Sequence, residues 1–379
     1  MPKDARKIEI PSDLLPSDGR FGSGPSRVRP EAARALAEAA DGYLGTSHRR
    51  DGVKSVVRQI QAGLRQLFSL PDEWQVVLGN GGTTTFWDTA AACLIDRHSE
   101  HLAFGEFSSR FAGVVAAAPH LEAPEVIEAA PGSRPDAKAL PHIDAYCLTH
   151  NETSTGVWAP VLRPDGAHPS SLVLVDATSA AGGIEVDLAG AGADAYYFAP
   201  QKVFAADGGL WLALLSPAAL ERARTLVAQT DRWVPASLDL VAAADNSAKG
   251  QTVNTPALAT LFLTRHQLEW MLESGGLAWA AARCRESSAY LYDWAEKSDF
   301  AQPFVNDPEH RSPVTVTVDL ADSVPADDLC AALRANGIVD LEGYRKLGRN
   351  QIRIATFPAT PPEDIRALSA CIDFVAARL

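Results

Sequence analysis

Short, nearly continuous apolar runs alternate with helical runs along the first two-thirds of the chain. The apolar runs have the length of β-strands and lie at residues 75–78, 145–149, 172–175, 195–198 and 210–215. Helical patterns follow several of them, including one that extends through Cys93. A strand that is apolar on both faces needs cover on both faces. The pattern therefore predicts an α/β fold, in which helices cover a mostly parallel sheet.

The pattern changes near residue 260. Two long helical runs, 257–272 and 277–297, are followed by an alternating strand at 314–318, a helix beginning near residue 326, and a final strand and helix after Gln351. We expect a large domain over residues 21–260 and a smaller C-terminal α+β domain over residues 261–379. The first 20 residues are expected to pack on the small domain or at the entrance to the active site.

The charge of the chain excludes several classes of partner. With 34 basic against 47 acidic residues, the 379-residue chain has a formal net charge of -13, which argues against nucleic acid and anionic membranes as partners. No apolar run reaches the length of a membrane span. The five cysteines have neither CxxC nor zinc-ligand spacing, so we expect reduced thiols, no metal site and a cytoplasmic protein. A small anionic ligand would require a local cluster of basic residues.

Lys202 is the first candidate for chemistry. It follows one apolar strand, precedes another, and is the only basic residue between Asp194 and Leu215. A lysine in such surroundings loses hydration, which lowers the pKa of its amine and makes it a nucleophile toward carbonyl carbon. The pattern favours a Schiff-base lysine over an ordinary solvated one.

Asp176 is the second candidate because it directly follows the apolar run 172–175. Open α/β sheets bind ligands at this carboxyl end of the strands. By itself, Asp176 is better explained as a helix N-cap. Together with Lys202, a buried carboxylate suits pyridoxal 5'-phosphate, whose ring nitrogen must be kept protonated.

A glycine-rich turn at residues 79–82 leads into threonines at the start of a helix, which is an arrangement suited to phosphate. The turn fits neither the Walker A pattern nor GxGxxG. Phe107 and Thr153 would complete a cofactor pocket by stacking on the ring and by hydrogen bonding. Each of them also has an ordinary structural explanation, in the core and in a turn respectively.

Two basic clusters supply the cations that a small anion needs. The first contains Arg345, Lys346, Arg349 and Arg353, and the second contains His48, Arg49 and Arg50. Basic clusters usually form solvated surfaces. Arg353, however, lies in an alternating strand, where its side chain should point away from those of Ile352 and Ile354. An arginine held in this way can bind a carboxylate through two hydrogen bonds.

Taken in order, these motifs resemble the phosphoserine aminotransferase family, which belongs to the class V, fold-type I branch of pyridoxal phosphate enzymes. The resemblance spans essentially the whole chain, from the FGSGP segment at residue 21. Its most specific parts are SHR at 47–49, NET at 151–153 and APQKVFAADGG around Lys202. The family implies a homodimer with active sites at the subunit interface.

The resemblance also implies roles for individual residues. Lys202 would carry the cofactor and transfer the proton, with Asp176 on the ring nitrogen. The cofactor would further contact Gly82, Thr83, Phe107, Thr153 and Gln201 of one subunit and Asn254 and Thr255 of the other. Arg353 would bind the α-carboxylate, whereas Arg345, with His48 and Arg49 of the neighbouring subunit, would bind the substrate phosphate or the glutamate side chain.

The implied reaction converts L-glutamate and 3-phosphohydroxypyruvate into 2-oxoglutarate and O-phospho-L-serine. The chain departs from many relatives in having Phe107 in place of tryptophan and Thr83-Thr84-Thr85 in place of a turn containing arginine. The spacing from Arg345 to Arg353 is also longer than in common members. Which arginine binds phosphate and which binds carboxylate therefore stays open.

Four other functions compete with this hypothesis. An alanine-glyoxylate or serine-pyruvate aminotransferase would need no second anion site. A cysteine desulfurase would need a reactive loop cysteine, whereas Cys330 lies in an amphipathic helical run. A nicotinamide oxidoreductase would need GxGxxG, and a noncatalytic binding protein gives no reason to combine a desolvated lysine with an acid at a strand end.

Overall fold

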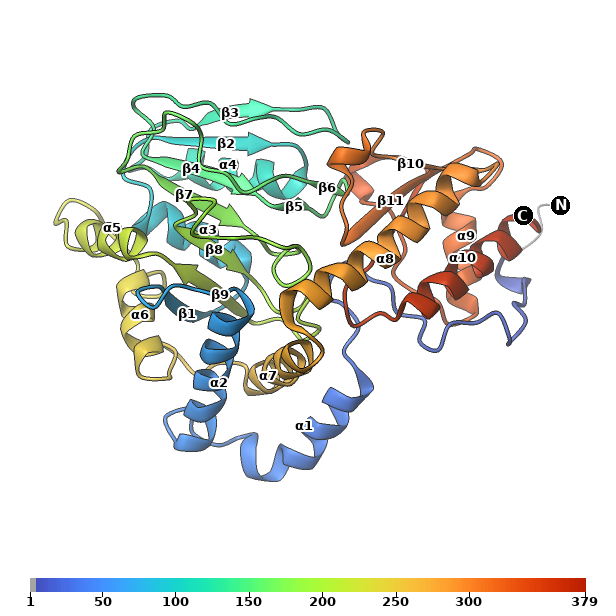
Figure 1. The fold of residues 1–379 in the computed structure, drawn as a ribbon, viewed down its shortest axis with the longest axis horizontal. Coiled ribbons are helices and arrows are strands. Elements are labelled where there is room, and N and C mark those ends of the chain that lie inside the picture. The colour runs from blue at the N-terminus through green and yellow to red at the C-terminus, as the bar shows by residue number, and fades with distance from the viewer. Residues whose placement is uncertain (1–4) are drawn as a thin grey trace.

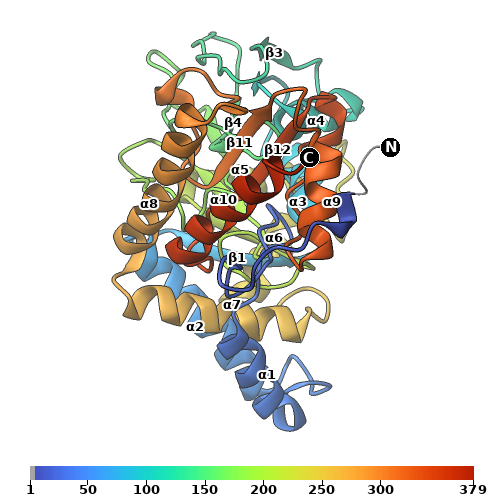
Figure 2. The same ribbon diagram turned by 90° about the vertical axis from the view of Figure 1, so that its right-hand side faces the viewer.

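A computed structural model describes residues 5–379 and divides the β-structure into two separate main sheets (Figure 1). Helices cover both faces of the seven-stranded sheet, and the three-stranded sheet lies beside the last two helices. Figure 2 shows the same chain from the side, with α1 (Pro30–Tyr43) extending away from the sheets. Within the described residues, no helix is long and apolar enough to span a membrane.

The large sheet is mostly parallel, as the apolar runs predicted. Its order is β1 (Gln75–Asn80), β9 (Leu210–Leu215), β8 (Ala195–Phe198), β7 (Leu172–Asp176), β4 (Ala145–Thr149), β2 (Ser99–Ala103) and β3 (Glu125–Glu128). The strands from β8 to β3 pair in parallel, whereas β9 runs antiparallel to both β1 and β8.

Helices bury both faces of this sheet. Side chains alternate along each strand, so that Val173 and Val175 of β7 enter one core while Leu172 and Leu174 enter the other. The first core is closed by α2 (Asp51–Leu67), α7 (Leu258–Glu273) and the start of α8 (Gly276–Lys297). The second is closed by α3 (Thr83–Cys93), α4 (Glu106–Ala117), α5 (Pro217–Val227) and α6 (Leu240–Ala248). This two-sided cover confirms the fold class.

A third core holds the C-terminal part together. It lies between the antiparallel strands β10 (Ala301–Pro303), β11 (Thr315–Leu320) and β12 (Gln351–Ala355) and the helices α8, α9 (Ala326–Ala335) and α10 (Pro362–Ala376). Ala5, Ile10 and Phe21 of the N-terminal segment are buried in the same core. Because α7 packs against α2, the covering of the large sheet continues beyond residue 260. The domain boundary at that residue stays a prediction.

Some elements were not foreseen from the sequence. Strand β2 contains Ser99, Glu100 and His101, which are all buried in spite of being polar, so its pattern does not resemble a core strand. Strand β3 lies at the edge of the sheet and is mostly exposed.

All five cysteines are buried and free. Among residues 5–379, no group of three or more His, Cys, Asp or Glu residues could hold a metal ion.

Candidate active site

A cavity of about 190 Å³ lies at the carboxyl ends of the parallel strands. It is bordered by the N-terminus of α3, the end of β7 and the segment after β8. Its lining includes seven of the residues singled out from the sequence: Gly82, Thr83, Phe107, Thr153, Asp176, Gln201 and Lys202. The tertiary structure thus assembles in one place residues that are up to 120 positions apart.

Asp176 ends β7 at the back of this cavity and is 4% exposed. Its Oδ2 accepts a 2.8 Å hydrogen bond from Trp87 Nε1, and its Oδ1 accepts one of 2.9 Å from the Thr178 backbone N–H. Burial nevertheless raises the pKa of the carboxyl above its ordinary value. A buried acid with oriented donors and no cationic side chain bonded to it is suited to a ligand that brings its own N–H.

Lys202 reaches the same cavity from the segment after β8. Its Nζ donates a 2.6 Å hydrogen bond to the backbone carbonyl of Ser23. Burial, and secondarily the nearby positive charge of Arg353, lower the pKa of the amine to about 8. A substantial fraction of this amine is therefore neutral near physiological pH, as a nucleophile or general base requires.

The helix start at α3 provides an anion site. Gly82 is the N-cap, no side chain caps the helix, and the first N–H groups have no intrahelical acceptor. Gly81 has a φ of +108°, and a Cβ there would lie 2.4 Å from Thr85 Oγ1. Glycine is therefore required for the turn that aims these N–H groups at the cavity.

The NET segment lies across the opposite wall. Thr153 Oγ1 donates to Ser179 Oγ at 2.7 Å, and Asn151 Nδ2 donates to the same oxygen at 2.8 Å. Glu152 is fully buried beneath α4 and accepts hydrogen bonds from backbone N–H and hydroxyl groups of Ser108 and Ser154. This carboxylate holds the helix that carries Phe107.

Three buried polar atoms in or near the cavity have no hydrogen-bond partner within residues 5–379. They are Asn151 Oδ1 and Gln201 Oε1 in the lining and Arg353 Nε nearby. Buried polar groups are normally satisfied, so each exception calls for an explanation, and a bound ligand is one. Together with the uncapped helix and Asp176, which bonds no cationic side chain among the described residues, these atoms fit a ligand that carries phosphate and further polar groups. The cavity thus fits pyridoxal phosphate in its donor and acceptor groups.

A second pocket, of about 760 Å³, lies between the N-terminal loop and the small sheet and contains the first basic cluster. Arg349 is paired with Asp319, and Lys346 is paired with Glu106 of α4. Among the residues described, Arg345 has no ion pair and is exposed. Arg353 faces away from the core that holds Ile352 and Ile354, as expected, and donates to the Thr153 carbonyl at 3.0 Å.

The remaining candidates lie elsewhere on the chain. His48 Nδ1 lies 3.2 Å from Thr255 Oγ1, and the Thr255 carbonyl accepts a hydrogen bond from Asn80 Nδ2 at 3.0 Å. Asn254 lies beside them, through a 3.3 Å hydrogen bond from its N–H to Asn80 Oδ1, and Arg49 is exposed. Neither pocket near Lys202 is lined by any of these four residues. Their contribution to the site stays a prediction.

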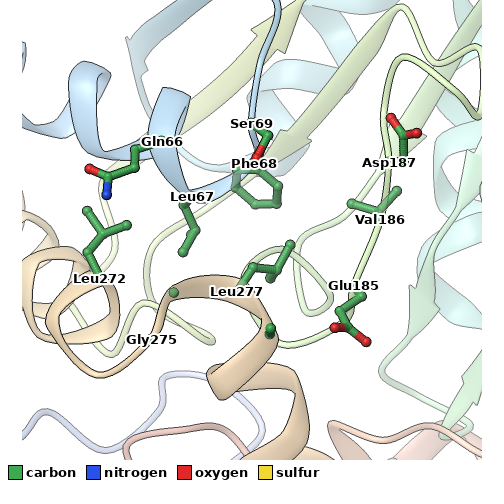
Figure 3. Close-up of a pocket in the computed structure, with 12 residues that line it drawn as sticks. Gln66, Leu67, Phe68, Ser69, Glu185, Val186, Asp187, Leu272, Gly275 and Leu277 are labelled. Atoms are coloured by element: carbon green, nitrogen blue, oxygen red, sulfur yellow. The ribbon is translucent and has the colours of Figure 1, made fainter.

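A different pocket, of about 680 Å³, lies where the end of α2 meets the junction of α7 and α8 (Figure 3). Its charged side chains are Glu185 and Asp187, and no basic residue lines it. An anionic ligand would be repelled there. The smaller cavity around Lys202 is the better candidate despite its size.

The sequence interpretation missed several residues of the site. Trp87, which bonds Asp176, stands four positions after Thr83 and therefore on the same face of α3, so helical spacing could have identified it. Ser179, Thr178 and Tyr344 carried no such signal. The Tyr344 ring lies 5.9 Å from Phe107 and 5.6 Å from the Arg353 guanidinium carbon.

The class-V aminotransferase family model matches residues 131–345. A phosphoserine aminotransferase of Nocardioides sp. is 58% identical over 373 residues, covering 98% of this chain and 99% of the relative. The crystal structure of a phosphoserine aminotransferase from Cytophaga hutchinsonii matches with a TM-score of 0.85 at 25% identity, over 94% of this chain and 99% of that one. An aspartate aminotransferase from Thermus thermophilus matches with a TM-score of 0.81 at 25% identity, over 94% and 99%.

The two-sided sheet and the lysine-aspartate cavity, together with these similarities, define a class-V aminotransferase of the pyridoxal phosphate type. Similarity of fold extends to aminotransferases of other specificity, so identity at the sequence level decides the finer question. The chain belongs to the phosphoserine aminotransferases.

Proposed function

We propose that the protein transfers the amino group of L-glutamate to 3-phosphohydroxypyruvate, giving 2-oxoglutarate and O-phospho-L-serine. Each half of the reaction exchanges an amino group for a keto oxygen, so nitrogen is conserved overall. The observation that carries the proposal is that one pocket beside Lys202 contains both Arg353 and Arg345, and that Arg345 has no ion pair among the described residues. A doubly anionic substrate needs two such cations.

Pyridoxal 5'-phosphate is the proposed cofactor, and when bound it supplies an electrophilic carbon and an electron-withdrawing ring. The phosphate would lie on the first turn of α3, at Gly82 and Thr83. Asp176 would keep the ring nitrogen protonated, and Phe107 would cover the ring. Thr153 and Gln201 would bond its polar substituents. Support comes from the uncapped helix and the unpartnered Gln201 oxygen.

Lys202 is proposed to bind the cofactor and to move the proton at the substrate α-carbon. Its lowered pKa favours this role because the neutral amine accepts a proton and returns it. Arg353, already held at the Thr153 carbonyl, would orient the α-carboxylate so that the α-proton faces the amine. Arg345 at the outer wall would then bind the distal phosphate or carboxylate.

A homodimer with shared active sites is proposed on separate grounds. His48 and Arg49 lie in the turn between α1 and α2, where His48 contacts Thr255, which is bonded in turn to Asn80 at the end of β1. His48 Nε2 is buried and unpartnered, and its neighbour Thr255 is exposed. We propose that His48 and Arg49, with Asn254 and Thr255, complete the site of the other subunit, in the cytoplasm.

Substrate comparison tests the reaction directly. With glutamate as donor, turnover of 3-phosphohydroxypyruvate should greatly exceed that of oxaloacetate, pyruvate and glyoxylate. Arg345→Gln should reduce kcat/KM mainly for the phosphorylated acceptor, whereas Arg353→Gln should reduce it for all acceptors. A preference for an unphosphorylated acceptor would reject the phosphoserine assignment and favour the specificity of the aspartate or alanine-glyoxylate enzymes.

Subunit mixing tests the shared site. Lys202→Ala and Arg49→Ala should each be inactive as homodimers. Hybrids formed by refolding the two together contain one site with both residues intact, so activity should return to about a quarter of the wild-type value. No recovery, with hybrids verified by mass spectrometry, would place Arg49 outside the partner's site.

A further inference from the structure

The loop at residues 21–26 lies between Lys202 and the small sheet. Ser26 Oγ donates to the Lys202 carbonyl at 2.5 Å, and Ser26 N–H donates to the Gln201 carbonyl at 2.9 Å. At its other end, the Phe21 carbonyl accepts a 3.1 Å hydrogen bond from Ala355 N–H of β12. The loop is therefore attached to the backbone of the lysine on one side and to the small sheet on the other.

The same loop also receives the side chain of the lysine. The Ser23 carbonyl is the only hydrogen-bond acceptor of Lys202 Nζ among residues 5–379. Ser23 is 4% exposed, and its own hydroxyl is buried without a partner. The backbone oxygen, and not the side chain, thus provides the polar contact at this position.

Gly24 gives the amine room to lie there. A Cβ on Gly24 would lie 2.1 Å from Lys202 Nζ and 2.5 Å from Cε, so any side chain would occupy the space of the amine. Gly24 also has a φ of +137°, which disfavours other residues. The missing side chain and the backbone conformation of Gly24 together let the Lys202 amine reach the Ser23 carbonyl.

We propose that Ser23 and Gly24 form a resting site for the free amine of Lys202, in which the Ser23 carbonyl holds the side chain while the cofactor carries the amino group. This inference rests on the proposed transamination, during which the lysine must leave the cofactor and later return to it. Ser23 acts here as a positioning residue through its backbone. Because the loop is bonded to β12, the resting site also connects the lysine to the small sheet that carries Arg353.

Three charged side chains near the amine influence the pKa of Lys202. Arg353 of β12 disfavours the ammonium form, whereas Asp176 of β7 and Glu152 of β5 (Asn151–Glu152) favour it. A carbonyl that accepts a hydrogen bond from the ammonium stabilises the charged form further. Removing that contact should lower the pKa of Lys202 while the three neighbouring charges stay in place.

The test uses the full-length enzyme loaded with pyridoxamine 5'-phosphate, in which Lys202 is free. Competitive acetylation with acetic anhydride across pH, read by mass spectrometry, gives the titration midpoint of each lysine, and the exposed Lys297 serves as internal reference. In Gly24→Ala the midpoint of Lys202 should fall by about one unit, the equivalent of one charge-assisted hydrogen bond. In the matched control Ser23→Ala, which keeps the carbonyl, it should stay unchanged.

A second variant covers the case in which Gly24→Ala does not fold. Ser26→Ala adds no atom and removes the bond that holds the loop to the Lys202 carbonyl, so a smaller shift in the same direction is expected. An unchanged midpoint in Gly24→Ala would overturn the resting site, as would a shift in Ser23→Ala equal to that in Gly24→Ala. Where Gly24→Ala does not fold, an unchanged midpoint in Ser26→Ala would overturn it. These outcomes do not depend on which keto acid is used, so failure of the proposed function would be recognised separately in the acceptor comparison.

Discussion

Replacing Glu152 with glutamine should destabilise the protein far more than loss of one surface charge would. The two carboxylate oxygens accept hydrogen bonds from the backbone N–H and the hydroxyl of both Ser108 and Ser154, with a longer contact of 3.4 Å from Phe107 N–H. Every group that faces this fully buried side chain can donate a hydrogen bond. A carboxylate can accept from all of them, whereas an amide has one oxygen and one NH₂ group.

The loss of stability follows from this mismatch between the amide and the surrounding hydrogen-bond donors. Whichever way the Glu152→Gln amide is oriented, its NH₂ group faces a backbone N–H, and a buried unsatisfied donor costs about 1–3 kcal/mol. Loss of the negative charge at the start of α4 adds roughly 0.3–1 kcal/mol. We expect the free energy of unfolding to fall by about 1–4 kcal/mol, and cofactor affinity to fall with it because α4 carries Phe107.

Urea unfolding of the cofactor-free variants measures the stability change, and titration with pyridoxal phosphate measures the affinity. Glu122→Gln is the matched control, since that carboxylate is half exposed and pairs only with the exposed Arg97, where a change below about 0.5 kcal/mol is expected. If Glu152→Gln unfolded at the same urea concentration as the control, the account of α4 positioning would be refuted.

Three further predictions concern the neighbours of the cofactor cavity. Trp87→Phe removes a donor from the buried Asp176 and should lower pyridoxal phosphate affinity roughly tenfold, measured by absorbance titration; unchanged affinity would contradict a positioning role for the indole. Lys202 titrates near 8 in the folded chain against an ordinary value of 10.5, so the folded state prefers the neutral amine and its stability rises with pH across that interval. Urea unfolding of the cofactor-free proteins measures this. Between pH 8 and pH 10.5, the free energy of unfolding of the wild type should rise by roughly 3 kcal/mol relative to that of Lys202→Met, and an equal pH dependence of the two proteins would refute the argument. Tyr344→Leu removes ring contacts with Phe107 and Arg353 and should raise the glutamate KM about five- to tenfold in steady-state assays, whereas Tyr344→Phe should not; equal effects of the two would point to the hydroxyl.

Much of the fold could be predicted from local patterns. The runs that became β4, β7, β8 and β9 are apolar at nearly every position, which is the usual composition of a strand buried on both faces. β2 could not be found in this way because its buried Glu100 and His101 are polar, and the partner of Glu100, the Lys138 backbone N–H, comes from a distant segment. The antiparallel direction of β9 likewise depends on the path of the connection from β8.

The candidate site divides in a similar way. Lys202 and Asp176 could be identified from sequence because a charged residue at the end of an apolar strand is unusual wherever the strand lies. Helical spacing from Thr83 places Trp87 on the same face of α3, but its bond to Asp176, 89 positions away, and the bonds of Ser179 to Asn151 and Thr153, 28 and 26 positions away, are not encoded in any local pattern.

Local patterns in the sequence were enough to predict the class of fold, to propose Lys202 and Asp176 as the reactive lysine and its acid partner, and to locate two basic clusters in an acidic chain. The tertiary structure alone decided which of those cations are free, because Arg349 and Lys346 are neutralised by Asp319 and Glu106 from distant segments while Arg345 is not. It also decided that the N-terminal loop faces Lys202. The physical reason is the same in both cases: pairing and burial depend on distance in space, which a linear pattern does not record.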